Sequence, residues 1–233
     1  METQDGFIVG VYNYCDRWCE RCPLTSRCRV FAEEQRLSFE TQSGTSADLV
    51  PHLRSLGSLA APLEESLPNE VGLPGDGRPA PHRWPDLPAA EIDLHDRVRE
   101  IGRRFREWLV PDACSADPVV RDSVEILQHF GTFIGPKVYR ALKGREECDE
   151  DGLLSDALGS AKAAFIAFDR LGDAWLRLAE RGAISVLEAE PLLSQLQVLT
   201  AELESLFPRA RQFVRPGFDE PAAMAMLEWR ERG

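Results

Sequence analysis

Several features that mark common protein classes are missing from this chain of 233 residues. No run of about 18 apolar residues occurs, so no segment has the character of a membrane-spanning helix. Acidic residues outnumber basic ones by 39 to 27, and the net charge of -12 argues against nucleic-acid binding, which needs a basic face. There is no phosphate-binding glycine loop, dinucleotide fingerprint or Ser-His-Asp order, which argues against kinase, Rossmann and hydrolase chemistry.

The first fourteen residues also lack the pattern of a secretory signal. They contain Glu2 and Asp5 and no basic stretch ahead of an apolar one. We therefore expect a cytoplasmic protein, in which thiols stay reduced. In that compartment a close group of cysteines is more often a metal site than a disulfide framework.

Cysteine is concentrated in one short stretch. Four of the six cysteines, Cys15, Cys19, Cys22 and Cys28, fall within fourteen residues and have the spacing C-x3-C-x2-C-P-x4-C. Structural zinc sites usually pair two C-x2-C units a dozen or more residues apart. Close consecutive spacings, with proline after a ligating cysteine, are more typical of iron–sulfur loops. The spacing therefore predicts that these four residues bind a 4Fe–4S cluster, with Zn²⁺ as the alternative and disulfides or free thiols as a third interpretation.

Two further features of this stretch bear on the choice. The first three cysteines have the spacing of radical S-adenosylmethionine enzymes, but those enzymes need a βα barrel, and the sequence shows no series of βα units. Arginines interleave the cysteines and are suited to offset the negative charge of four thiolates, although ordinary solvated charges remain an open interpretation. These arginines are Arg17, Arg21, Arg27 and Arg29.

The segment Asn13–Cys28, which reads N-Y-C-D-R-W-C-E-R-C-P-L-T-S-R-C, resembles the start of an uncharacterised bacterial protein family with this cysteine pattern. The resemblance is clearest over residues 13–31, and the stretch Ser123–Leu142 is more vaguely similar. That family has no assigned function. The resemblance therefore implies a small bacterial protein headed by cysteines and nothing about its activity.

The rest of the sequence predicts an all-α protein built on an up-down four-helix bundle over residues 89–210. Residues 1–42 form the four-cysteine segment, which includes an apolar lead-in over 7–14 and a short helix over 30–40. Residues 43–88 hold eight of the sixteen prolines and are interpreted as a linker. Residues 211–233 are expected to form a C-terminal amphipathic segment.

Apolar residues recur at helical spacing in four stretches, about 89–110, 117–144, 153–181 and 185–208. Gly135-Pro136 is expected to kink or break the second helix, and Gly144 to end it. Ser185 with Glu188 predicts a capping box at the start of the fourth helix, but Pro191 leaves a start near Glu190 equally open. Cys114 and Cys148 flank the second helix and are interpreted as lone thiols.

A few polar residues on the predicted helices are candidates for a site inside the bundle. Two Glu-x-x-x-His pairs, Glu91 with His95 and Glu125 with His129, each share a helix face and offer a metal chelate. The rotation of about 100° per residue places Glu91 at the edge of the apolar stripe and the other three side chains outside it. Solvated or locally bonded side chains are therefore the favoured interpretation.

The same rotation places Asp169 on the core-facing side of the third helix, close to Phe165. A buried carboxylate must be paired, protonated or functional. The favoured interpretation is an ion pair with a basic residue of another helix, and Asp169 is also the one candidate catalytic residue.

Three functions are compatible with these observations. The first is a metal-binding protein whose four-cysteine module serves electron transfer, sensing or scaffolding, with an unidentified protein or redox partner. The second is an enzyme that uses the bundle interior, with the four cysteines holding structural zinc. The third is an interaction protein whose acidic surface and terminal segment bind a partner. The sequence favours the first and leaves the oligomeric state open.

Overall fold

The computed structural model describes residues 2–42, 87–108, 116–146 and 153–219. These residues are mostly helical, with one small sheet, so the prediction of an all-α protein is confirmed. The chain divides into two units, residues 1–27 with 86–233, and residues 28–85. The expectations for Cys114, Cys148, nearly all of the 43–88 linker and the segment after Asp219 lie outside the described residues.

The N-terminal part begins with a β-hairpin. Strands β1 (Thr3–Gln4) and β2 (Phe7–Ile8) pair in antiparallel fashion, with Thr3 opposite Ile8. Asp5 and Gly6 connect them with φ values of 52° and 84°, the two positive values that a type I′ turn requires. Three short 3-10 turns follow: η1 (Val11–Asn13), η2 (Cys19–Arg21) and η3 (Thr25–Arg27). The apolar lead-in over 7–14 is thus extended only at its start.

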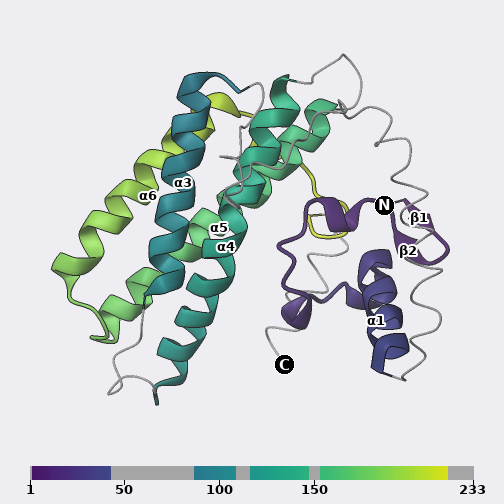
Figure 1. Ribbon diagram of the computed structural model, residues 1–233, viewed down its shortest axis with the longest axis horizontal. Helices are drawn as coiled ribbons and strands as arrows, with labels where there is room; N and C mark the ends of the chain where they lie inside the picture. The colour runs from purple at the N-terminus through teal and green to yellow at the C-terminus, as the bar shows by residue number, and fades with distance from the viewer. Residues whose placement is uncertain (1, 43–86, 109–115, 147–152, 220–233) are drawn as a thin grey trace, which may run out of the picture. The chain divides into compact units, whose positions relative to one another are not determined.

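Four helices of the first unit share one apolar core. They are α3 (Ala89–Glu107), α4 (Pro118–Glu146), α5 (Leu153–Glu180) and α6 (Val186–Leu206). Helix α4 packs on α3 and α5, while α6 packs on the same two helices, as Figure 1 shows. The predicted apolar stripes supply most of the core. Its largest fully buried side chains include Ile101, Phe105, Leu127, Phe130, Ile134, Phe165, Phe168, Leu171 and Leu203.

The helix ends follow their sequence signals. The Asp117 carboxylate accepts a 2.8 Å hydrogen bond from the Val119 N–H and caps α4. Gly182, at φ 70°, ends α5 in a Schellman motif, in which the Ala183 N–H bonds the Leu178 carbonyl. Ser185 caps α6 in a complete capping box with Glu188, so the earlier of the two predicted starts is correct.

Helix α4 is longer than the prediction. It runs without a break through Pro136, so of the expected kink or break the break is ruled out, and it continues beyond Gly144, so the expected end is wrong. The helix also buries more than one face, because Phe130, Phe133 and Leu142 are buried in addition to the predicted stripe. Packing on several sides therefore outweighs the hydrogen bond that proline removes.

The second unit contributes one described helix, α1 (Arg29–Gln42), where the sequence predicts a short helix over 30–40. Within it, Arg36 and Glu33 form an ion pair with a distance of 3.0 Å between Nε and Oε2.

Candidate functional site

In the loop that carries Cys15, Cys19 and Cys22, backbone N–H groups donate hydrogen bonds to two of the sulfur atoms. The Leu24 N–H donates to Cys22 Sγ at 3.4 Å. At Cys15 the Arg17 N–H is a donor that acts to lower the pKa of the thiol, and the thiol itself donates to the Tyr12 carbonyl oxygen at 3.5 Å. Both backbone donors lie two residues beyond the cysteine that they serve. Arg17 has a φ of 59°, the left-handed conformation rare for a residue with a side chain. The backbone of the loop is thus shaped around two of its sulfur atoms.

All four candidate ligands are half-buried, and none of these four forms a disulfide. Among the described residues, however, no three His, Cys, Asp or Glu side chains are close enough together to hold a metal ion. Cys28 belongs to the second unit, and the other three cysteines belong to the first. Binding of one metal group by the four cysteines therefore stays a prediction.

A buried lysine lies close to Cys15. Burial raises the pKa of the Cys15 thiol, while the Arg17 N–H and the charge of Lys137 act in the opposite direction. Burial also lowers the pKa of Lys137 to about 8, against the attraction of Cys15. The Lys137 ammonium donates a 2.8 Å hydrogen bond to the Asn13 carbonyl, so it ties α4 to the start of the loop.

The loop is fastened to α4 mainly by Trp18. The Trp18 ring stacks on the His129 ring with centroids 4.5 Å apart, and it meets Phe130 edge-on at 5.8 Å. His129 Nε2 lies 2.8 Å from the Asp16 carbonyl oxygen, which identifies that nitrogen as the donor. The indole and imidazole thus seat the middle of the loop on the helix.

An arginine completes this attachment. The Arg21 guanidinium lies 4.0 Å from the Trp18 ring centroid, donates to Asp122 Oδ1 at 2.6 Å and pairs with Glu125. Glu125 and His129 therefore bind the cysteine loop. The favoured interpretation of this pair, solvated or locally bonded side chains, did not foresee these partners, which lie more than a hundred residues away in the sequence.

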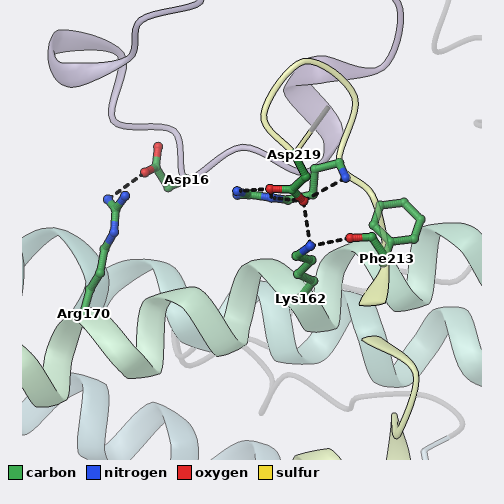
Figure 2. A network of polar contacts seen from close by, with 6 residues as sticks. Asp16, Lys162, Arg170, Phe213 and Asp219 are labelled. Atoms are coloured by element: carbon green, nitrogen blue, oxygen red, sulfur yellow. Dashed lines mark hydrogen bonds and ion pairs between the residues drawn. The ribbon is translucent and has the colours of Figure 1, made fainter. Parts of the chain in front are cut away.

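Helix α5 is joined both to the cysteine loop and to the C-terminal turn, as Figure 2 shows. Asp16 pairs with Arg170 at 3.0 Å. Lys162 lies 2.7 Å from the Asp219 carboxylate and also donates to the Phe213 carbonyl. Arg215 binds the other oxygen of Asp219 at 2.9 Å.

The C-terminal turn, residues 213–219, is in direct contact with the cysteine loop. A Cβ atom on Gly217 would lie 2.9 Å from Ile8 Cδ1 and 3.1 Å from Leu24 Cδ1, and the φ of 78° at this position favours glycine. Tyr14 meets the Phe213 ring edge-on at 5.0 Å and covers Gly159 of α5. The start of the 211–233 segment is therefore part of the support for residues 8–24.

Asp169 does not lie where the sequence predicts. Its side chain is 56% exposed and pairs with Arg211 at 3.2 Å, in the 3-10 turn η5 (Ala210–Gln212). The prediction that Asp169 faces the core is wrong. The turn η5 packs on α5 beside Asp169, and the carboxylate lies at the exposed edge of that contact. The expected ion pair is present, and a role as a buried catalytic acid loses its structural basis.

Glu91 and His95 depart in the opposite direction, since both are buried. The Glu91 carboxylate pairs with Arg145 of α4, and the His95 ring lies 5.6 Å from that of Tyr139. Burial lowers the pKa of His95, so the imidazole is neutral in the folded chain near neutral pH. The prediction that His95 points outward is wrong. The two residues form part of the α3–α4 contact.

Comparisons with protein-family models, with curated proteins and with solved structures found no match to this chain. No helix among the described residues is long and apolar enough to cross a membrane. The function must therefore be argued from the residues themselves.

Proposed function

We propose that Cys15, Cys19, Cys22 and Cys28 bind a 4Fe–4S cluster as thiolates, and that the protein acts in electron transfer, in sensing or as a cluster-dependent scaffold. On this proposal the compartment is a reducing one, the cytoplasm, and the partner is a protein that exchanges electrons or reads the state of the cluster. We also infer that α3 to α6 form an up-down four-helix bundle, because each helix packs on the two expected neighbours.

The observation that carries the proposal is the repeated N–H···S contact. Cys22 accepts the Leu24 N–H at 3.4 Å, and the Arg17 N–H acts in the same way on Cys15, where burial nevertheless keeps the pKa of the thiol raised. A hydrogen bond donated to sulfur favours the thiolate over the thiol, and such bonds tune the potentials of sulfur-ligated clusters. A cysteine that only fills space gains little from a backbone shaped in this way.

Charge supports the same proposal. Four thiolates around an oxidised 4Fe–4S cube, or around Zn²⁺, leave a net charge of about −2. The buried ammonium of Lys137 interacts electrostatically with Cys15 and offsets part of that charge. Arg21 is committed to Asp122 and Glu125, so it serves to attach the loop.

The proposal requires the thiols to converge when the group binds, because the described residues contain no ready-made set of three ligands. Convergence is compatible with the support beneath the loop. The loop is attached through Asp16, Trp18 and Arg21, which lie between the cysteines in the sequence. These attachments involve no cysteine sulfur atom.

Anaerobic purification followed by analysis of iron, acid-labile sulfide and zinc tests the proposal. We expect iron and sulfide in matching amounts and a brown colour, all lost in Cys19→Ser and kept in the control Cys148→Ser. One zinc per chain without colour would support the alternative, in which the loop is a structural clip and the helices carry the activity or bind the partner. Protein with neither metal and with reactive thiols would overturn the proposal.

A further inference from the structure

Helices α3 and α4 form a groove that is lined by arginine. Helices α3 and α4 leave a hollow of about 340 Å³ between them, a volume in the range of small-ligand sites. Its sides are formed by Arg99, Arg103 and Arg106 with Asp96 and Glu100. The floor is provided by residues 131–136 of α4, with Gly131, Thr132, Gly135 and Pro136 as its lining residues.

Glycine makes this groove possible. A Cβ on Gly102 would lie 2.4 Å from the Gly131 carbonyl oxygen, so the two helix backbones touch at this crossing. Just beyond the crossing, Gly135 leaves space that the stem of Arg99 covers, since a Cβ there would lie 3.1 Å from Arg99 Cγ. Because Gly131 and Gly135 have no side chain, the backbone of α4 itself lines the groove next to the arginines.

The three arginines are not equally occupied. Arg103 binds Glu100 at 2.6 Å and Glu107 at 2.5 Å, so its donors are in use. Within the described residues, Arg99 and Arg106 have only long ion pairs, 3.9 Å to Asp96 and 3.6 Å to Glu107. Both side chains are about half exposed, and such pairs are weak in water. Their planar donor sets remain accessible to an anion.

The spacing of these two side chains indicates the kind of anion. Arg99 and Arg106 are seven residues apart on α3, which places them on one face and about 10 Å apart along the axis. A ligand with more than one charged group suits two guanidinium groups that project from positions this far apart better than a single small anion does. Guanidinium groups bind phosphate oxygens in a bidentate manner.

We propose that the groove is a binding site for a small oligophosphate, such as a diphosphate group, held between Arg99 and Arg106. This site is independent of the cysteine loop and of whatever metal the loop binds. On a chain with a net charge of -12, such a ligand needs a local site of this kind to bind at all.

The test is calorimetric titration of the full-length protein with inorganic pyrophosphate at low ionic strength. We expect saturable binding with one site per chain, weakened about tenfold or more in the double variant Arg99→Gln/Arg106→Gln, the cost of losing charge-assisted hydrogen bonds. The control is Arg104→Gln/Arg177→Gln, which removes the same charge from exposed positions outside the groove. We expect its affinity to stay within about twofold of the unchanged protein.

A third variant separates geometry from charge. Gly135→Ala keeps every charge but places a methyl group against the Arg99 stem, so we expect weaker binding in a normally folded protein. Absence of saturable binding to the unchanged protein would overturn the proposal. Equal weakening in the groove and control double variants would also overturn it, because binding would then follow net charge alone. Circular dichroism of each variant establishes that the helices are intact.

Discussion

The contact between Asp219 and α5 gives a stability prediction that can be worked through in numbers. Burial by itself would raise the pKa of Asp219, but the hydrogen bonds from Arg215 and Lys162 outweigh it and lower the pKa from 3.8 to about 2. The gap of nearly two pH units corresponds to about 2 kcal/mol of folding free energy. The carboxylate is 19% exposed, so solvent screening reduces this figure only in part.

The direction of the pH dependence follows from the sign of that shift. The unfolded chain binds a proton at Asp219 before the folded chain does, because the folded pKa is the lower one. The stabilisation is therefore complete above about pH 5 and is lost as the pH falls from about 4 to about 2. Asp219→Asn keeps the shape of the side chain and leaves Lys162 and Arg215 without their counter-charge.

We expect Asp219→Asn to lower the free energy of unfolding by about 2 kcal/mol at pH 7, and the loss to shrink steadily below pH 4. Urea unfolding followed by circular dichroism, at a series of pH values where both proteins are folded, measures the difference. The matched control is Asp169→Asn, which removes an exposed ion pair with Arg211 and should cost under about 1 kcal/mol. A loss that stays constant from pH 7 to pH 3 would refute the reasoning, because the carboxylate charge would then not be its source.

Three more predictions concern the helices. Gly131→Ala should lower the free energy of unfolding by about 1–3 kcal/mol, because the new Cβ would lie 2.5 Å from the Gly102 carbonyl oxygen. In the same urea experiment the control Gly172→Ala should be neutral or stabilising, because its Cβ meets only Leu196, at 3.5 Å. Ser185→Ala removes the cap of α6 and should cost about 1 kcal/mol, measured in the same way. The lowered pKa of His95 means that stability should fall as the pH drops below 6.5, since the unfolded chain binds the proton first, and His95→Gln should remove this part of the pH dependence.

The helices of the core could be predicted because their apolar residues repeat with the period of the helix. The stripes in α3, α5 and α6 are buried as expected, and the ends at Asp117, Gly182 and Ser185 follow from local rules. Local rules also explain the hairpin, because Asp5-Gly6 is a strong signal for a type I′ turn. Long-range packing explains the failures.

Glu91 illustrates such a failure. Ending the second helix at Gly144 leaves Glu91 without a partner, so its burial has no explanation from the sequence. In the structure α4 continues to Glu146, and Arg145 reaches the Glu91 carboxylate across the α3–α4 contact. The prediction for Asp169 is wrong for a related reason. A helical wheel gives the direction of the side chain, but it does not show how much of α5 the turn η5 covers.

The cysteine spacing predicted the candidate ligands but not the support beneath them. The partners of Asp16 and Arg21 lie more than a hundred residues further along the chain, at Arg170 and Asp122, and no spacing rule connects them. Lys137 had no signal either, because a lysine in an apolar stripe looks like an ordinary surface residue until its neighbours are known.

The separation between the loop and its support has a consequence for assembly. Residues 15–22 are synthesised early, but His129 and Arg170, which anchor the loop, come much later, and the C-terminal turn at 213–219 comes later still. Ile8 and Leu24 pack on Gly217, so the loop reaches its final surroundings only after that turn has been made. Local order without tertiary packing is weak in segments this short. If the loop binds a metal or a cluster, stable binding should therefore follow the folding of the helical core, and variants that loosen the C-terminal turn should lower metal occupancy without touching a cysteine.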